Sequence, residues 1–394
     1  MWEMVKLGDV CKIVNGSTPL RTDRRYWDNG CNPWFTIDDL RAQGKNITQT
    51  IQCVSDVAVN EKKVRLVPSN SVLLCCTASI GEVAISRVPM ATNQQFNALI
   101  PLNSTVESEY LYYAALTLKQ ALLDVSGKTT INFISMGKLK SIAIPLPPIA
   151  QQQQIVAKLD AAFAQIDKAI EVAEAKETDI EKLKASMLSA MLNNTDWQAV
   201  KLGEVCKIVN GGTPKSNVKS YWGGDVQWLT PKDMGKKLSR YVISTERQIS
   251  LEGLKNSSAK LVPAQSVILS CRAPIGHVFI NEVDMSFNQG CKGLLTTDQV
   301  VVEFLYYFLF SAKQLLNDLG TGTTFKELSG KKLADVKIPL PPITQQQQIV
   351  AKLDAAFAEL DKAKASVAQI KANYTALKSA ILASELQPEK SEAV

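Results

Sequence analysis

The chain has 394 residues, 46% of them hydrophobic, and a formal net charge of +6 at pH 7. This length predicts two or more domains with enough apolar side chains to fill their cores. Because no apolar run is long enough to span a bilayer and the N-terminal residues lack the pattern of a signal peptide, we expect a cytoplasmic protein without a membrane anchor.

The eight cysteines and the single histidine, His277, argue against a zinc site. No cysteines have Cys-x-x-Cys spacing, and one histidine cannot complete a Cys/His ligand set. Cys11 and Cys206 are equivalent positions of an internal repeat, as are Cys76 and Cys271, and both pairs stand among Val, Ile and Leu. We therefore expect buried, reduced thiols there.

The first segment of the chain, residues 5–19, returns almost unchanged at residues 200–214. In both copies a β-rich run ends at an Asn-Gly step, which is typical of a turn. A Tyr-Trp pair follows at the same interval in each copy, Tyr26-Trp27 and Tyr221-Trp222. We expect these aromatic pairs in the core; the alternative is that they are stacking platforms for bases.

Two divergent stretches come next, at roughly residues 29–65 and 224–260. The copies align again at residues 66–81 and 261–276, which we interpret as buried strands followed by glycine turns.

Each copy then has an Asn-Gln step, Asn93-Gln94 and Asn288-Gln289, for which turn capping is a simpler interpretation than contact with adenine. A helix is predicted at residues 109–124 and again at 303–318.

The most strongly repeated segment is residues 144–164, which returns at 338–358 with 20 of 21 positions identical. The exception is Ala150 against Thr344. A repeat of domain size indicates a duplication rather than a solenoid. Its proline cluster favours an extended approach to a helix. In the second copy Thr344 and Gln347 fit a capping box at the helix start.

The helix that follows each proline cluster carries apolar residues at alternating steps of four and three, without Gly or Pro. This spacing predicts a coiled-coil seam, and about 40 residues form a rod of roughly 60 Å. The stripe needs a partner, and the simplest is the other copy. The alternative is that each helix packs only on its own domain.

We predict an α+β protein with two similar mixed α/β domains and two long coiled-coil helices. The predicted first domain is residues 1–143 and the first helical spacer 144–195. The second domain is 196–337. The second spacer is 338–394, with a disordered tail from Gln387.

The basic charge belongs to the globular parts and not to the helices. Residues 1–149 carry a net charge of +3 and residues 197–343 carry +6, whereas residues 150–196 carry −3 and residues 344–394 are neutral. This distribution is a mild indication of a polyanion partner.

The order of parts and the repeated Pro-Leu-Pro-Pro-Ile-x-Gln-Gln-Gln-Gln-Ile-Val-Ala-Lys-Leu-Asp motif resemble the specificity subunit of type I restriction–modification systems over essentially the whole chain. The resemblance implies two target-recognition domains, each reading half of a bipartite site in double-stranded DNA and joined by the two long helices. It implies that these helices pack antiparallel, relate the domains by a pseudo-twofold axis and set the spacing between the half-sites. It implies no active site and no cofactor in this chain. Two methyltransferase subunits would use S-adenosylmethionine, and restriction subunits would use ATP and Mg²⁺.

Residues that read different bases should differ between the two domains, whereas those that hold phosphates should be shared. The candidates for DNA contact in the first domain are Arg24, Arg25, Arg41, Lys45, Lys62, Lys63 and Arg65. Those in the second domain are Lys215, Lys219, Lys232, Lys236, Lys237, Arg240, Lys255 and Lys260. A solvated side chain is the alternative for each.

Arg272 is a sharper candidate, because it replaces Thr77 within a segment that is otherwise nearly invariant. An arginine there could read guanine bidentately; the alternative is a solvated arginine at a strand end. Lys128, Thr129 and Thr323 stand in Gly/Thr/Lys-rich loops that suit phosphate contact, or are plain loops.

Two other classes of protein fit less well. A self-contained methyltransferase needs a cofactor loop, and Asn32-Pro33-Trp34-Phe35 has Trp in place of the second Pro of an amino-methyltransferase signature. Gly127-Lys128-Thr129 is not a phosphate-binding loop, because Leu122 stands where the first glycine is required. A structural coiled-coil protein would show neither basic domains nor divergence in blocks.

Overall fold

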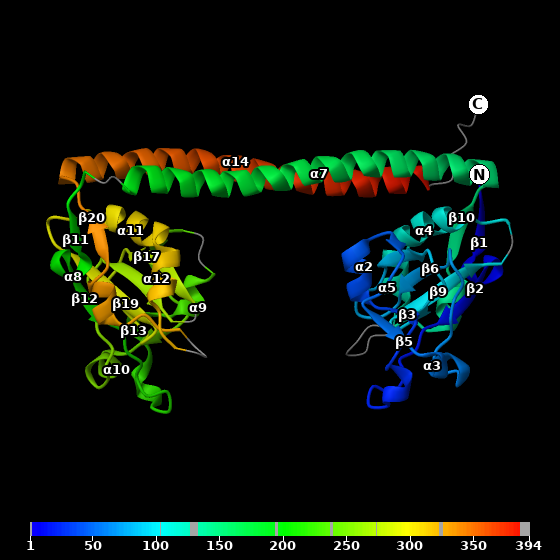
Figure 1. The fold of residues 1–394 in the computed structure, drawn as a ribbon, viewed down its shortest axis with the longest axis horizontal. Coiled ribbons are helices and arrows are strands. Elements are labelled where there is room, and N and C mark those ends of the chain that lie inside the picture. The colour runs from blue at the N-terminus through cyan, green and yellow to red at the C-terminus, as the bar shows by residue number, and fades with distance from the viewer. Residues whose placement is uncertain are drawn as a thin grey trace. The chain divides into compact units, whose positions relative to one another are not determined.

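The computed structural model describes residues 2–102, 104–126, 133–193, 196–236, 239–272, 274–322 and 326–386. The chain forms two compact units, unit 1 (Met1–Val172 and Gln369–Val394) and unit 2 (Ala173–Ala368). Each unit contains one mixed α/β domain and part of two long helices, α7 (Ile149–Leu192) and α14 (Ile343–Glu385) (Figure 1). The predicted α+β class, with two similar halves and a pair of long helices, is confirmed.

The domain of unit 1 is built on a five-stranded sheet of order β2-β9-β6-β7-β4, in which only β4 and β7 pair in parallel. Its strands are β2 (Cys11–Asn15), β9 (Phe96–Pro101), β6 (Val72–Cys75), β7 (Val83–Ser86) and β4 (Asn46–Ile47). Strand β6 reads as a continuous apolar run because both of its faces are covered. Val72 and Leu74 face the core under helix α4, whereas Leu73 and Cys75 face a second core that contains Phe35.

A smaller three-stranded sheet, β5-β3-β8, lies at the end of unit 1 away from the long helices (Figure 1). Its strands are β5 (Gln52–Val54), β3 (Asn32–Phe35) and β8 (Ala91–Thr92), and β1 (Glu3–Lys6) pairs separately with β10 (Ala143–Leu146). The helices of this domain are α1 (Leu7–Val10), the 3-10 helix η1 (Arg24–Tyr26), α2 (Ile37–Gln43), α3 (Asp56–Asn60), α4 (Ser108–Thr117), α5 (Lys119–Val125) and α6 (Met136–Ser141).

Unit 2 repeats this architecture element by element. Its five-stranded sheet contains β12 (Cys206–Asn210), β19 (Cys291–Thr296), β16 (Val267–Cys271), β17 (Ile275–Asn281) and β14 (Tyr241–Val242), in that order. Its smaller sheet contains β15 (Gln248–Ile249), β13 (Trp222–Leu229) and β18 (Met285–Phe287), and β11 (Ala199–Lys201) pairs with β20 (Lys337–Pro339). Its helices are α8 (Leu202–Val205), η2 (Lys219–Tyr221), α9 (Pro231–Met234), α10 (Leu251–Lys255), α11 (Val302–Ser311), α12 (Lys313–Leu319) and α13 (Gly330–Ala334).

Two details of the sequence prediction are corrected. The helix predicted at 109–124 is two helices, α4 and α5, that meet at Leu118, and the repeat copy breaks in the same way at Ala312. Both junction residues have ψ near zero, and neither Gly nor Pro marks the break in the sequence. The capping box at Thr344 is also wrong, because α14 already begins at Ile343 and places Thr344 inside its first turn.

The turn predicted after the buried strands is confirmed at Gly81, whereas Gly276 lies within β17, where the pairing of β16 with β17 is irregular. Gly81 has φ +88° and Gly276 has φ +102°, a region of backbone conformation that strongly favours glycine.

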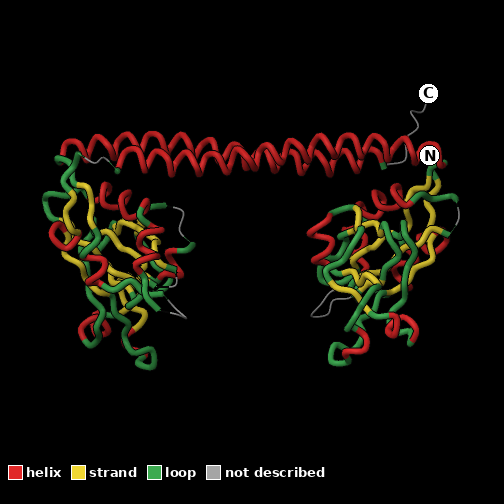
Figure 2. The backbone as a smooth tube through the Cα atoms, in the orientation of Figure 1, coloured by secondary structure: helices red, strands yellow, loops and turns green. Residues whose placement is uncertain are grey.

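The long helices complete the core of each unit. In unit 1, Ile155 and Leu159 of α7 are buried with Leu382 of α14 and Leu386, the residue after that helix, in the core that also covers the five-stranded sheet. In unit 2 the two helices exchange roles (Figure 2): the buried residues are Leu188 and Leu192 of α7 with Ile349 and Leu353 of α14. Each helix therefore packs both on a domain and against the other helix. These two arrangements are the alternatives raised by the sequence, and the structure combines them.

Ion pairs between the helices fix their antiparallel direction within each unit. In unit 1, Lys378 of α14 lies 2.8 Å from Asp167 of α7. In unit 2 the equivalent pair joins Lys184 of α7 to Asp361 of α14. The same contact is thus made twice with the helices exchanged, as expected for antiparallel copies of one sequence.

Candidate nucleic-acid interface

The repeated Asn-Gly-x-Thr-Pro loop of each unit is held by two tryptophans of the smaller sheet region. In unit 1 the indole nitrogen of Trp34 donates to the carbonyl of Ser17 (3.0 Å), and that of Trp27 donates to the carbonyl of Leu20 (3.1 Å). The Tyr-Trp motif and the loop are therefore one structural cluster.

Unit 2 builds the same cluster from equivalent residues. Trp228 donates to the carbonyl of Gly212 (3.0 Å) and Trp222 to the carbonyl of Lys215 (3.2 Å). The tryptophan rings of each pair meet edge to face, at 5.1 Å in unit 1 and 5.0 Å in unit 2. The prediction that these aromatic motifs belong to the core is confirmed for Tyr26, which is buried, whereas Trp27 and Trp222 are half-buried.

The Asn-Gln steps join the same clusters. The side-chain oxygen of Asn93 accepts from the backbone nitrogen of Gln95 (3.0 Å), and that of Asn288 accepts from Gly290 (2.9 Å). The following glutamines, Gln94 and Gln289, are hydrogen-bonded to the threonines of the repeated loops. Turn capping, the simpler interpretation of this motif, is therefore confirmed.

Arg21 and Arg247, which the sequence reasoning missed, cover the tryptophan pairs. The guanidinium carbon of Arg21 lies 3.9 Å from the ring centroid of Trp27, and that of Arg247 lies 3.7 Å from Trp222. The two arginines are not aligned in the repeat, because Ser216 stands opposite Arg21 and Gln52 stands opposite Arg247. In each of these two aligned pairs only one unit has an arginine, and this exchange is the sequence signal that could have identified the two residues.

Several cations of the first candidate set lie on the exposed surface of unit 1. Arg24, Lys62, Lys63 and Arg65 are exposed and sit near η1 and α3 in the sequence, at the smaller sheet. Others already have acidic neighbours: Arg25 pairs with Asp23 (2.7 Å) and Glu61 (3.4 Å), and Arg41 lies 3.8 Å from Glu82. Such exposed pairs are weak enough for a phosphate to compete with them.

The candidates of unit 2 are arranged in a similar way. Lys215, Lys219, Lys232, Lys255 and Lys260 are exposed. Lys236 pairs with Glu246. Lys128, Thr129, Lys237 and Thr323 lie outside the described residues.

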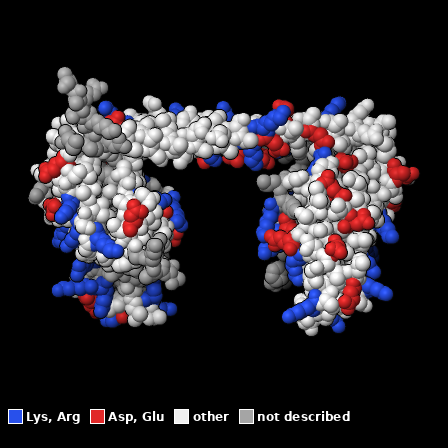
Figure 3. Space-filling model, turned by 180° about the vertical axis from the view of Figure 1, so that it is seen from behind, with Lys and Arg blue, Asp and Glu red and all other residues white. Residues whose placement is uncertain are grey.

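Figure 3 shows lysine and arginine side chains at the end of each unit that lies away from its helices, with acidic side chains among them. The role of each cation in DNA contact stays a prediction.

Lys45 and Arg240, two of the predicted DNA contacts, are bound to other residues of their own unit. They occupy equivalent positions, and each is bound to a helix aspartate and a tyrosine. Arg240 donates to Asp354 of α14 (3.0 Å) and to the hydroxyl of Tyr307 (2.9 Å). The guanidinium is thereby occupied in holding the domain to the helix, and we leave it out of the proposed interface.

Lys45 makes the matching contact in unit 1. Its ammonium lies 2.6 Å from Asp160 of α7 and 3.3 Å from the hydroxyl of Tyr113, which also binds Asp160. Only 21% of the Lys45 side chain is exposed, so it too is left out of the proposed interface.

The Asp354 cluster predicts an acid-dependent loss of stability. Burial acts to raise the pKa of Asp354, but hydrogen bonds from Arg240 and Tyr307 outweigh it and hold the pKa below its usual value of 3.8. A depressed pKa stabilises the folded state above about pH 4 and ceases to do so as the pH falls through the folded pKa. We expect Asp354→Asn to cost about 1–2 kcal/mol at pH 7 and progressively less below pH ~4.

Thermal unfolding of the wild type and Asp354→Asn between pH 3 and 8 measures this difference. Asp160→Asn is the matched variant in unit 1 and should behave alike, because the pKa of Asp160 is lowered in the same way. Asp179→Asn, at an exposed ion pair on α7, is the control and should change little. A cost that stays constant down to pH 3 would show that the charge of Asp354 is unimportant.

Arg272 pairs with Glu327 across an isolated β-bridge. The same bridge in unit 1 joins Thr77, the equivalent of Arg272, to Phe133, the equivalent of Glu327. Both members of the bridge therefore differ between the copies. The Arg272 and Glu327 side chains remain 43% and 40% exposed. A pair this exposed leaves the guanidinium available to a stronger acceptor, so guanine reading by Arg272 stays a prediction.

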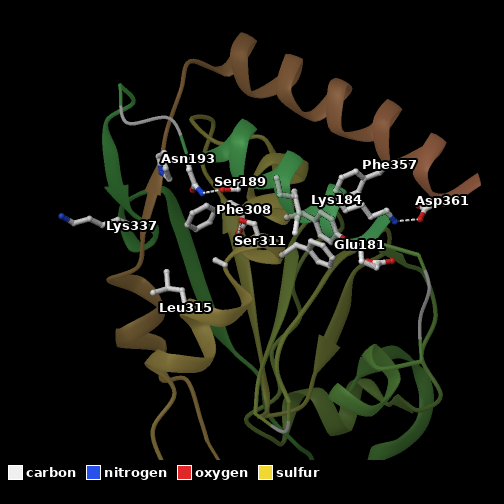
Figure 4. A pocket seen from close by; sticks show the side chains of 16 residues that line it. Glu181, Lys184, Ser189, Asn193, Phe308, Ser311, Leu315, Lys337, Phe357 and Asp361 are labelled. Carbon is white, nitrogen blue, oxygen red and sulfur yellow. Dashed lines mark hydrogen bonds and ion pairs between the residues drawn. The ribbon is translucent and has the colours of Figure 1, made fainter. Parts of the chain in front are cut away.

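Unit 2 also contains a cavity of about 720 Å³ between the last turns of α7 and helices α11 and α12 (Figure 4). Among its lining residues, Lys184 is paired with Asp361, and Glu181 is paired with Lys364 from outside the lining. The lining offers no nucleophile with an adjacent base. We therefore do not assign it to catalysis.

Thiol and metal chemistry do not define a site either. Cys11, Cys76, Cys206 and Cys271 are buried, as predicted, and burial raises the pKa of Cys76 to about 11 and that of the other three thiols to about 12. Within the described parts of the chain, no group of His, Cys, Asp and Glu is arranged to hold a metal ion. No helix in the same residues is long and apolar enough to cross a bilayer.

The fold is that of a duplicated α+β protein in which a pair of long helices closes both domains. The sequence model of the "Type I restriction modification DNA specificity domain" matches residues 1–181 and again 194–372. The chain therefore belongs to the family of type I restriction–modification specificity subunits.

Two relatives illustrate the similarity. The chain is 38% identical over 183 residues to the type I restriction enzyme MjaIX specificity subunit of Methanocaldococcus jannaschii, which covers 46% of this chain and 40% of that protein. It is 31% identical over 258 residues to the EcoR124I/EcoR124II specificity subunit of Escherichia coli, covering 62% of each. These alignments span less than two thirds of either relative.

Solved structures share the fold across nearly the whole chain. A chain from a study of complex assembly and conformational transition of the type I R-M system has a TM-score of 0.80 at 22% identity, covering 98% of this chain and 97% of that one. The HsdS subunit from Thermoanaerobacter tengcongensis has a TM-score of 0.57 at 21% identity, covering 98% and 96%.

Proposed function

We propose that this chain is the DNA-binding specificity subunit of a type I restriction–modification complex, reads a bipartite site with one half-site per domain, and contributes no active site. The observation that carries this proposal is the pair of domains with one fold and different basic surfaces. The Trp-held loops and the helix contacts are the same in both units. The divergent stretches supply the differences, as two readers of different sequences require.

The long helices are proposed as the ruler between the half-sites and as part of the docking surface for methyltransferase subunits. Leu183 of α7 and Ile370 and Leu377 of α14 are 45–49% exposed, although they belong to the apolar stripe. In unit 2, Phe310 and Leu315 beside the cavity are 45% and 48% exposed. Apolar side chains left uncovered along one element favour a protein partner. S-adenosylmethionine, ATP and Mg²⁺ would be bound by the partner subunits, and the complex would act in the cytoplasm.

The test is a genome-wide map of N6-methyladenine in cells that express the candidate methyltransferase subunit with and without this chain. We expect a bipartite motif that disappears when the chain is absent. If no motif depends on the chain while it co-purifies with the methyltransferase subunit, the proposed function is wrong. If the chain does not co-purify with the candidate methyltransferase subunit, that subunit is not its partner.

Arg272→Ala tests direct reading in the second half-site. We expect loss of discrimination at one base pair, equivalent to about 1–3 kcal/mol, measured by competition between duplexes that differ at single positions. Glu327→Gln is the matched control, because it removes the ion pair and keeps the guanidinium. Equal weakening on every duplex would instead identify a phosphate contact.

A further inference from the structure

A guanidinium group occupies the same place in both units although it comes from different positions of the repeat. In unit 1 it belongs to Arg21, on the loop that follows the Asn-Gly-Ser-Thr-Pro segment, and it donates to Gln52 (2.6 Å). Gln52 lies opposite Trp34 in the pairing of β3 with β5. In unit 2 the residue opposite Trp228 is Arg247.

The two sequence differences are therefore reciprocal. Where unit 1 has Arg21 and Gln52, unit 2 has Ser216 and Arg247. Each arginine lies over the equivalent tryptophan pair, at 3.9 and 4.6 Å from the ring centroids in unit 1 and 3.7 and 5.3 Å in unit 2. The two units therefore share the location of the guanidinium over the tryptophan pair, although the arginine comes from a different sequence position in each.

Neither guanidinium has a carboxylate partner in the part of the chain that the structure describes. Among ion pairs between described residues, none involves Arg21 or Arg247, whereas Arg25, Arg240 and Arg272 all have carboxylate partners. Arg21 and Arg247 are also exposed. An arginine that only stabilised the tryptophans would gain nothing from remaining unpaired in an otherwise mixed-charge surface.

Stacking on an aromatic ring holds a guanidinium by one face and leaves its in-plane N–H groups directed outward. These donors match two oxygens of a phosphate and are already oriented, so little side-chain entropy is lost on contact. Because both units present the cation at one place while the surrounding surfaces diverge, the contact suits a feature that both half-sites share. The DNA backbone is such a feature, and base edges are not.

We propose that Arg21 and Arg247 are equivalent phosphate-binding residues that anchor each domain to the backbone of its half-site. This proposal rests on the proposed function. The arginines position the domain on the duplex and do not select the base sequence.

The test uses the full-length chain, purified with its methyltransferase subunit, and duplexes that carry the mapped motif or a scrambled half-site. We expect Arg21→Ser to weaken binding about tenfold on every duplex and to reduce the slope of log affinity against log salt by about 1. Adding Gln52→Arg to Arg21→Ser recreates the arrangement of unit 2 and should restore both quantities. The reciprocal set in unit 2 is Arg247→Gln and its combination with Ser216→Arg.

Lys182→Gln, at an exposed lysine of α7, is the control for loss of one positive charge and should leave the slope unchanged. An unchanged slope with a lower melting temperature in Arg21→Ser would show that the arginine only covers the tryptophans and would overturn the proposal. A change in the preferred bases would also overturn it, in favour of base reading. If the wild-type complex does not prefer the mapped motif, the proposed function fails together with this inference.

Discussion

Replacing residues 20–65 with residues 215–260 should change one half of the methylated motif and leave the other half unchanged. The transferred stretch carries most of the surface in which the domains differ, including the exposed cations around η1 and α3. Since these residues lie within unit 1, the second domain is untouched. We expect the altered half-site to acquire base preferences of the second half-site, because specificity follows the side chains that face the bases.

We expect the chimera to fold because the exchange preserves two of the contacts that cross its boundaries, although Arg87 loses its bond to Asn46. Ser216 and Arg247 move together, so the arginine over the tryptophan pair is kept. Arg240 replaces Lys45 and meets the same partners, Tyr113 and Asp160. Methylome sequencing of cells with the chimera measures the motif. Changes in both half-sites would disprove modular reading, and a circular dichroism melt separates that outcome from misfolding.

Shortening both long helices by four residues should shorten the spacer between the half-sites by about two base pairs. Removing 171–174 from α7 and the equivalent 365–368 from α14 deletes about 6 Å from each helix, at 1.5 Å per residue. The deletion in α7 crosses the boundary between the units, and the deletion in α14 ends at it. They retain the ion pairs of Asp167 with Lys378 and of Lys184 with Asp361, so the register within each unit is kept.

Deletion from α7 alone is the matched control for this experiment. It leaves two helices of unequal length, and one of the two sets of helix contacts must break, so we expect loss of binding. The spacer is read from the methylated motif of each variant. An unchanged spacer in the double deletion would show that the helices do not set the distance between half-sites.

The architecture could be predicted from sequence because its signals are repeated and periodic. The 20 of 21 identities at the proline cluster and the long apolar stripe each define an element without tertiary information. Gly81 marks a turn for the same reason, since its backbone conformation favours one residue type. The break at Leu118 was missed because it depends on packing and has no sequence marker.

The candidate interface was harder to predict because the sequence position of a lysine or arginine does not show which group its side chain binds. Lys45 and Arg240 are indistinguishable in sequence from a DNA-binding cation, yet they bind Asp160 and Asp354, which lie more than 100 residues away. Arg21 and Arg247 were overlooked because an aligned repeat compares equivalent positions, and these arginines reach one place from two different positions.

Because α7 and α14 exchange roles in the two cores, the core of unit 1 includes residues that are translated last. Leu382 and Leu386 complete the core around Ile155 and Leu159, but they are translated 194 residues after their repeat equivalents Leu188 and Leu192. At about 5–20 residues per second, the apolar surface of the first domain stays uncovered for roughly 10–40 s after those equivalents emerge. We therefore expect a chain that terminates before Leu382 to leave this part of the first core uncovered.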